Sequence, residues 1–94
     1  MLTIKTINEF KRNYKLALKR GCNPNDLVEV LELLKNEIPL PEKYRDHKLH
    51  NYAGLKDARE CHINPDWLLV YRIDKDVLIL ELLRLGTHSD LFRP

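Results

Sequence analysis

The chain has 94 residues and a mass of 11.2 kDa, which is the size of one small domain. Its composition, 44% hydrophobic and 32% charged, excludes an intrinsically disordered protein, and its longest apolar run, Trp67 to Tyr71, is far too short for a transmembrane helix. The two cysteines, Cys22 and Cys61, do not make a disulfide framework, and no apolar signal core follows a charged N-terminus. We therefore expect a single domain over residues 1–94 in a reduced, cytoplasmic protein.

The net charge of +2 conceals an uneven distribution along the chain. Residues 1–20 carry six basic side chains against Glu9 alone, a balance of +5, whereas residues 21–42 carry Lys35 against five acidic side chains, a balance of −4. A domain of this kind can present a basic face to a polyanion while it stays close to neutral overall. Ordinary solvated helix faces would give the same charge pattern.

The first part of the chain predicts a short strand followed by a helix. Residues 2–5 are typical of the strand. Thr6 and Glu9 have the spacing of a capping box, which predicts that the helix begins after Thr6, and Gly21 is a suitable residue for ending it. Apolar residues recur at helical spacing along one arc of this helix. The neighbouring arc holds four basic residues, Lys11, Arg12, Lys15 and Lys19.

A second helix is predicted to begin at Asn23 and Pro24, where asparagine caps the helix and proline takes its first position. Its apolar stripe has i, i+3, i+4, i+7 spacing and consists of Leu27, Val30, Leu31 and Leu34. Pro39 and Pro41 end the helix, and an irregular segment is expected to about Asp46. Two helices so close together predict an antiparallel helical hairpin packed on another layer.

The C-terminal half predicts an antiparallel sheet. Residues 59–63, 67–73 and 77–85 are rich in β-branched and aromatic side chains, and turn-like residues separate them at 64–66 and 74–76. The links are too short for a parallel crossover, so neighbouring strands must pair antiparallel. Composition alone would also allow a helix over 77–85, but the adjacent strand and tight turn favour a hairpin. The predicted fold class is α+β, a two-helix hairpin packed on an antiparallel β-sheet.

Several side chains that can move protons or hold anions lie at predicted turns and strand ends. Histidine is the side chain best suited to proton transfer near neutral pH, and His47, His62 and His88 all have such positions. Arg84 could hold an anion through two hydrogen bonds, and Asp66 lies in a tight turn. Metal-independent RNA cleavage needs a base for the 2′-hydroxyl, an acid for the leaving 5′-oxygen and cations for the phosphate, and this set supplies all three.

Each of these residues also has a simpler structural interpretation, because a lone histidine is commonly structural or solvated. His47, His50 and His62 meet no recognised zinc-ligand spacing, so we predict no metal and no cofactor. The three glycines do not form a phosphate-binding loop. Cys61 and His62 alternate on a predicted strand, which places them on opposite faces and predicts a core position for Cys61.

Residues 59–71 have the sequence RECHINPDWLLVY, residues 84–92 have the sequence RLGTHSDLF, and Leu40–Pro41 leads to DHKL at residues 46–49. Together these stretches resemble the central signature, the C-terminal signature and the loop of the YafQ family of RelE-like toxins. This family belongs to the RelE/ParE superfamily of toxins from bacterial type II toxin–antitoxin systems. The resemblance also takes in both helices. Its His-x-x-Pro-Asp-Trp and Arg-x-Gly-Thr-His motifs are specific when they occur together in so short a protein.

The resemblance implies a RelE-like, microbial ribonuclease-like fold with two helices on one face of an antiparallel sheet. It implies a toxin that enters the ribosomal A site, cuts mRNA without a metal and leaves a 2′,3′-cyclic phosphate. The implied partners are a cognate antitoxin and the 70S ribosome with its rRNA and mRNA, and no membrane is involved.

Carried over position by position, the resemblance implies a catalytic cluster of His47, His62, Asp66, Arg84 and His88. His88 is expected to be the general acid, and His47 and Arg84 are expected to hold the phosphate. Asp66, His62 and His47 all stay open as the group that takes the proton. The implied substrate-binding residues are Trp67, Phe92 and His50. The residues expected to contact rRNA are Lys11, Arg12, Lys15 and Lys19.

Two other functions fit the same residues. A degenerate toxin would block the A site without cleavage, although the retained His, Asp and Arg set argues against degeneracy. A ribosome-independent RNase of the same fold would need to stack free bases, and the chain has only seven aromatic residues for that purpose.

Overall fold

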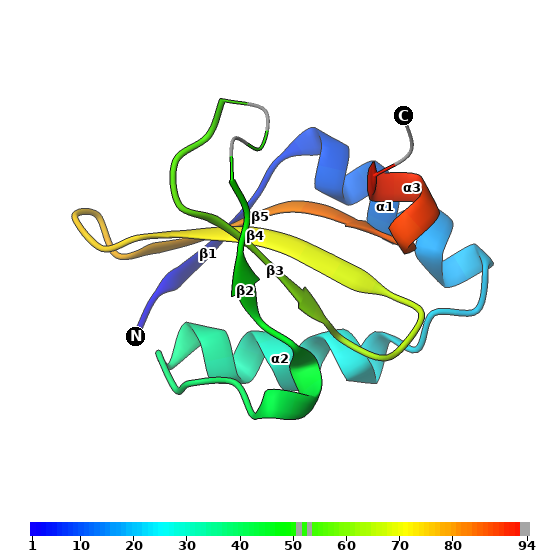
Figure 1. Cartoon of the computed structure of the whole chain (residues 1–94), viewed down its shortest axis with the longest axis horizontal. Coiled ribbons are helices and arrows are strands. Elements are labelled where there is room, and N and C mark those ends of the chain that lie inside the picture. The colour runs from blue at the N-terminus through cyan, green and yellow to red at the C-terminus, as the bar shows by residue number, and fades with distance from the viewer. Residues whose placement is uncertain (51, 53, 93–94) are drawn as a thin grey trace.

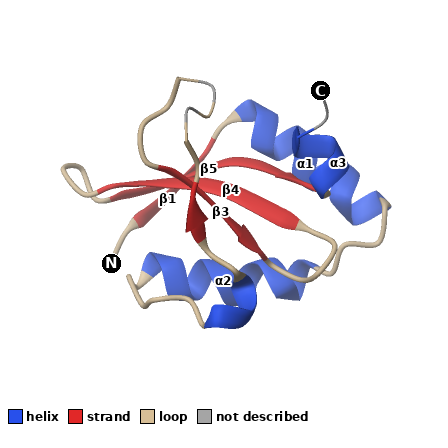
Figure 2. Ribbon diagram, in the orientation of Figure 1, coloured by secondary structure: helices blue, strands red, loops and turns tan. Residues whose placement is uncertain are grey.

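A computed structural model describes residues 1–50, 52 and 54–92 of the chain. In this part, three helices pack on a five-stranded sheet with the strand order β1-β5-β4-β3-β2 (Figures 1 and 2). The helices are α1 (Asn8–Lys19), α2 (Pro24–Lys35) and α3 (His88–Phe92), and a 3₁₀ turn spans Glu42–Tyr44. The strands are β1 (Thr3–Thr6), β2 (His47–Lys48), β3 (Ala58–His62), β4 (Leu68–Asp74) and β5 (Ile79–Gly86).

The predicted capping box at the start of α1 is wrong. Ile7 takes the N-cap position without a side-chain cap, because Thr6 is the last residue of β1 and pairs with Leu82. Glu9 binds Arg12 in the next turn instead, with 2.5 Å between Oε2 and Nη2. The predicted end of the helix is confirmed, since Gly21 has a φ of +94°.

The end of α1 and the start of α2 are closed by local hydrogen bonds. The Gly21 amide donates to the Leu18 carbonyl at 3.2 Å and the Cys22 amide donates to the Ala17 carbonyl at 3.0 Å, which is the Schellman pattern. The Asn23 side chain accepts a hydrogen bond from the Asn25 amide at 2.9 Å. Asn23 therefore caps α2 as predicted, and proline takes the first helical position.

The sheet is antiparallel from β2 to β5, as predicted for the C-terminal half, and mixed as a whole because β1 runs parallel to β5. The last predicted strand begins later than expected, at Ile79. Residues 75–78 form the turn, and Leu78 has a φ of +56° there. The sequence did not predict β2, the 3₁₀ turn or α3, each of which has five residues or fewer.

The core has two parts, one on each face of the sheet. Both long helices contribute to the larger cluster, where Phe10 and Ala17 of α1 and Val30 of α2 pack with sheet residues. The sheet residues of this cluster include Cys61, Leu69, Tyr71, Leu80, Leu82 and Leu85. The smaller cluster lies on the opposite face and consists of Ala58, Leu68, Val70, Leu83 and Leu91 of α3. We call this second face the distal face and the cluster on it the distal cluster.

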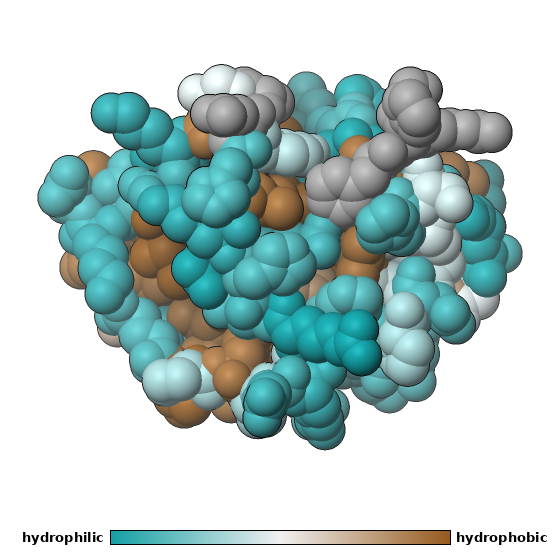
Figure 3. All heavy atoms as spheres, in the orientation of Figure 1, coloured by the Kyte–Doolittle hydropathy of each residue, from teal (hydrophilic) through white to brown (hydrophobic). Residues whose placement is uncertain are grey.

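Cys61 is fully buried in the larger cluster, which confirms its predicted core position. Burial raises the pKa of its thiol, so the sulfur stays protonated. None of the helices in the described ranges is long and apolar enough to cross a bilayer. Hydrophilic side chains cover most of the surface seen in Figure 3, and hydrophobic atoms show in gaps between them.

Candidate active site

Strand register brings three of the predicted catalytic residues to the distal face. His62 pairs with Leu68, and Arg84 pairs with Val70, both of which belong to the distal cluster. His47 on β2 pairs with Glu60, which in turn pairs with Val70. Cross-strand partners share a face of the sheet, so the three side chains leave their strands on the distal face.

A β-bulge sets the position of Arg84 on this face. Tyr71 pairs with Leu82 and the next residue back, Val70, pairs with Arg84, so Leu83 is an extra residue in β5. The Arg84 side chain is 29% exposed, and its Nε lies 3.7 Å from Oε1 of Glu9 on α1. The same Nε is buried and has no hydrogen-bond partner in the described part of the chain. The guanidinium is therefore only partly engaged by the protein.

His47 is held at both ring nitrogens. Its Nδ1 lies 2.8 Å from the Arg45 carbonyl oxygen, and its Nε2 lies 3.4 Å from Oε1 of Glu60. The Glu60 side chain is only 6% exposed, whereas that of His47 is 51% exposed. Among the described residues, the second carboxylate oxygen of Glu60 has no hydrogen-bond partner. Sequence reasoning missed Glu60, although an acidic residue next to Cys61 in a predicted buried strand was an available signal.

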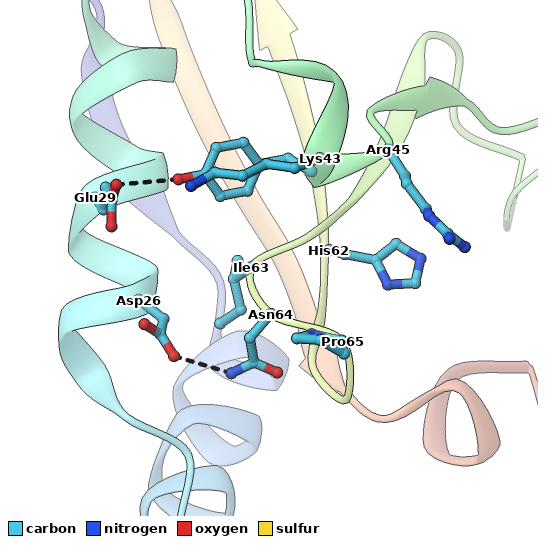
Figure 4. A pocket seen from close by; sticks show the side chains of 9 residues that line it. Asp26, Glu29, Lys43, Arg45, His62, Ile63, Asn64 and Pro65 are labelled. Carbon is cyan, nitrogen blue, oxygen red and sulfur yellow. Dashed lines mark hydrogen bonds between the residues drawn. The ribbon is translucent and has the colours of Figure 1, made fainter.

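His62 lines a hollow of about 430 Å³ between the end of β3, α2 and the 3₁₀ turn with the residue after it, Arg45 (Figure 4). In Figure 4 the His62 imidazole and the Arg45 side chain point the same way, away from Asp26 and Glu29 of α2. Both carboxylates accept hydrogen bonds from other side chains that line the hollow. Tyr44 Oη donates to Glu29 at 3.1 Å, and Asn64 Nδ2 donates to Asp26 at 3.0 Å. One side of the hollow is acidic and hydrogen-bonded, and the other presents His62 and a cation.

The turn that carries Asp66 is organised by Asn64. Its Oδ1 accepts hydrogen bonds from the amides of Asp66 at 2.9 Å and Trp67 at 3.0 Å, and its Nδ2 ties the turn to Asp26 of α2. Asp66 is exposed at this turn. Sequence reasoning predicted the turn but not the role of Asn64, which depends on a contact with a helix 38 residues away.

Arg84 and Trp67 share a second hollow, of about 240 Å³, which Arg20 and Asp90 also line. Trp67 is 8% exposed, and the Arg20 guanidinium lies 5.1 Å from the centroid of its ring. His88 is exposed at the first position of α3, which directly follows β5. The predicted residues thus surround one end of the sheet, but no single hollow takes all of them.

The remaining predicted site residues have separate positions. His50 is exposed and lines a third hollow, formed by residues 48–50 and 54–57, which includes none of the other predicted site residues. The side chain of Phe92 lies outside the described part of the chain. The four basic residues of α1 are exposed, but Arg12 is paired with Glu9, so only Lys11, Lys15 and Lys19 form no ion pair with described residues.

The family model for the bacterial toxin of type II toxin–antitoxin system, YafQ, matches residues 2–93. The chain belongs to the YafQ family. Among its relatives, the mRNA interferase toxin YafQ of Escherichia coli K12 is 39% identical over 85 residues, which cover 89% of this chain and 88% of the relative.

Solved structures of YafQ toxins and related chains have the same fold. A metal-bound toxin from Helicobacter pylori is 49% identical, with a TM-score of 0.88 over 98% of this chain and all of that one. YafQ from the E. coli DinJ–YafQ complex is 36% identical, with a TM-score of 0.86 over 98% of this chain and 99% of that one. In the described part of this YafQ-family chain, no three His, Cys, Asp or Glu residues are grouped to hold a metal ion.

Proposed function

We propose that this YafQ-family chain is a cytoplasmic, ribosome-dependent mRNA endoribonuclease that a cognate antitoxin neutralises. The observation that carries the proposal is the strand register, which gathers His47, His62 and Arg84 on the distal face beside the start of α3. The relatives named mRNA interferase toxins support the reaction class, and the E. coli DinJ–YafQ complex supports an antitoxin as partner.

The reaction proposed here is an internal transfer at phosphorus. His62 or Asp66 takes the proton from the 2′-hydroxyl, and the 2′-oxygen then bonds to the phosphorus. Arg84 and His47 face the charge that develops on the phosphate oxygens. The bond from phosphorus to the 5′-oxygen breaks, and His88 gives that oxygen its proton. The products are a 2′,3′-cyclic phosphate and a 5′-hydroxyl, and no step of this proposal uses a metal or a cofactor.

In this proposal the ribosome holds the mRNA in position for cleavage. The hollows beside His62 and Arg84 measure about 430 and 240 Å³, and neither encloses the whole set of predicted catalytic residues. A site of this kind gains from a partner that fixes the scissile phosphate in the right geometry, because orientation alone supplies a large part of a rate enhancement. The lysines of α1 supply a basic surface for rRNA.

The test is primer extension on an mRNA translated by purified ribosomes, with and without this protein. Cuts confined to the ribosome-bound message are the expected result, and a 3′-terminal cyclic phosphate is the expected product. Stalled translation with an intact message would overturn the cleavage and favour a blocking toxin. Equal cutting of naked RNA would overturn the dependence on the ribosome.

Charge reversal at Lys11 and Lys15 is expected to weaken ribosome binding without unfolding the protein. Both side chains are exposed on α1 and form no ion pair within the described residues. Loss of two phosphate contacts should reduce the slope of log affinity against log salt by about one per lysine. Co-sedimentation with ribosomes in rising salt measures that slope. The matched control is Lys75→Glu in the turn after β4, and an unchanged slope in the Lys11→Glu/Lys15→Glu variant would contradict the assignment.

A further inference from the structure

The short helix that carries His88 is tied to the end of α1 by one ion pair. Arg20, the C-cap residue of α1, places its Nη1 2.8 Å from Oδ2 of Asp90 in α3. The same guanidinium lies over the ring of Trp67, 5.1 Å from its centroid. Arg20 therefore joins three segments of the chain, the end of α1, the start of β4 and α3 (Figure 1).

Asp90 also closes the first turn of α3 from within. Its Oδ2 accepts a hydrogen bond from the Thr87 amide at 2.9 Å, and its own amide donates to Thr87 Oγ1 at 3.3 Å. This reciprocal pair caps the helix. A helix of five residues is too short to be stable alone, so its position depends on such contacts.

The chain leaves little room for α3 to shift toward the sheet. A Cβ placed on Gly86 would lie 3.0 Å from the Asp90 Cβ and 3.3 Å from Leu91 Cδ2. The glycine at the end of β5 thus allows the close approach of α3. Asp90 is fixed on one side by this packing and on the other by Arg20.

We propose that Arg20 and Asp90 form a clamp that positions His88 for proton transfer to the leaving oxygen. This inference rests on the proposed function, in which His88 is the general acid. Arg20 is a positioning residue here, because it acts on His88 through α3. His88 is two residues before Asp90 in the same five-residue helix, so a change at the clamp moves the helix that carries the imidazole.

The ion pair between Arg20 and Asp90 is formed at neutral pH. The Thr87 amide and the Arg20 guanidinium hold the pKa of Asp90 below its usual range, so its carboxylate stays charged. The Arg20 and Asp90 side chains are 40% and 38% exposed, so their ion pair contributes little to overall stability. Its expected effect is on geometry, since small misplacements of a catalytic group cause large losses of rate.

The experiment compares two variants that break the clamp with opposite changes in charge. Arg20→Gln removes a positive charge, and Asp90→Asn removes a negative one. If Arg20 only attracts RNA, Asp90→Asn should leave cleavage unchanged or accelerate it. If the clamp positions His88, both variants should lower kcat on ribosome-bound mRNA by about 10- to 100-fold, with KM changed much less. The double variant should be no slower than the slower single variant, because both changes break the contact between Arg20 and Asp90.

Two further variants sharpen the result. Arg20→Lys keeps the charge but loses the planar group that both stacks on Trp67 and bonds to Asp90, so it should restore kcat only in part. Lys75→Gln is the matched control, because Lys75 also forms an exposed ion pair, with Glu37 at 3.6 Å. Trp67 is the single tryptophan, so its fluorescence reports the loss of the Arg20 contact without any ribosome.

The outcomes separate the clamp from the proposed function. Wild-type protein that does not cleave ribosome-bound mRNA would overturn the function, and with it the clamp's role in catalysis. Active wild-type protein together with a fully active Asp90→Asn variant would overturn the clamp alone. Reduced kcat in both single variants, with shifted Trp67 emission and a normal Lys75→Gln control, would support it.

Discussion

Replacing His88 with alanine is expected to lower cleavage of ribosome-bound mRNA by at least about 100-fold, the usual contribution of a general acid. In the proposed reaction the 5′-oxygen leaves as an alkoxide unless a proton reaches it. His88 is exposed at the start of α3, so its loss should leave the core intact. Single-turnover cleavage on programmed ribosomes measures the rate, and relief of growth arrest gives the same answer in cells.

The controls for His88→Ala test whether the protein still folds and binds. Antitoxin binding should be unchanged, and Ser89→Ala, which alters the next exposed residue of α3, should cleave at the normal rate. A fully toxic His88→Ala variant would show that another group supplies the proton.

Replacing Asp46 with alanine is expected to destabilise the fold by about 2–3 kcal/mol, because it removes the acceptor for two side chains at once. Tyr71 Oη donates a short hydrogen bond to one carboxylate oxygen, and Arg59 Nη2 donates to the other at 3.0 Å. Tyr71 is 1% exposed, so its hydroxyl would be left buried without this partner. Arg59 is 38% exposed and would be rehydrated, which limits the loss.

Urea unfolding checks this value, with an unchanged m-value as evidence that the unfolded state is the same. Tyr71→Phe removes only the hydroxyl and should cost about 1 kcal/mol. Lys75→Ala, which breaks an exposed ion pair, should change stability by less than about 0.5 kcal/mol. A loss below that limit for Asp46→Ala would contradict the assigned role of the carboxylate.

Asp46 also links this network to the candidate site. Arg59 and Tyr71 pair across β3 and β4 on the helix-covered face, and they hold Asp46 there. His47 follows Asp46 directly, pairs with Glu60 and projects on the distal face. The two-residue strand β2 is therefore anchored by the side chain just before it on the helix-covered face, while its first side chain projects on the opposite face, where the candidate site lies.

Local sequence patterns predicted the long elements well. The apolar stripe of α2, with its Asn23 cap, and the β-branched and aromatic runs of β3 and β4 both depend on near neighbours in the chain, which a sequence displays directly. The predicted alternation of Cys61 and His62 is confirmed, since Cys61 lies in the larger cluster and His62 pairs with a residue of the distal cluster.

The errors occurred where distant segments compete for the same residue. Thr6 has the local pattern of a helix cap, but its backbone belongs to β1 because Leu82, far along the chain, pairs with it. Thr87 and Asp90 have the spacing of a capping pair and do cap α3, yet the apolar periodicity there was too short to indicate a helix.

The difference between local patterns and contacts of distant segments also applies to the candidate site. The sequence predicted a set of proton-transferring and anion-binding side chains that includes His62, Arg84 and His88. Their supporting residues were missed. Glu60 beside His47 and Arg20 beside Asp90 are identified only when strand register and helix packing are known.

The parallel pairing of β1 with β5 has a consequence for how the protein is made. Thr3 pairs with Ile79, so the first strand synthesised has no neighbour in the sheet until the strand that carries Arg84 has also been synthesised. Closing so long a loop costs more chain entropy than joining β4 to β5 through their short turn. The nascent chain therefore cannot complete its sheet, or the distal face built on it, while only its N-terminal half exists. A toxin proposed to act on ribosomes therefore lacks its complete sheet through most of its own translation.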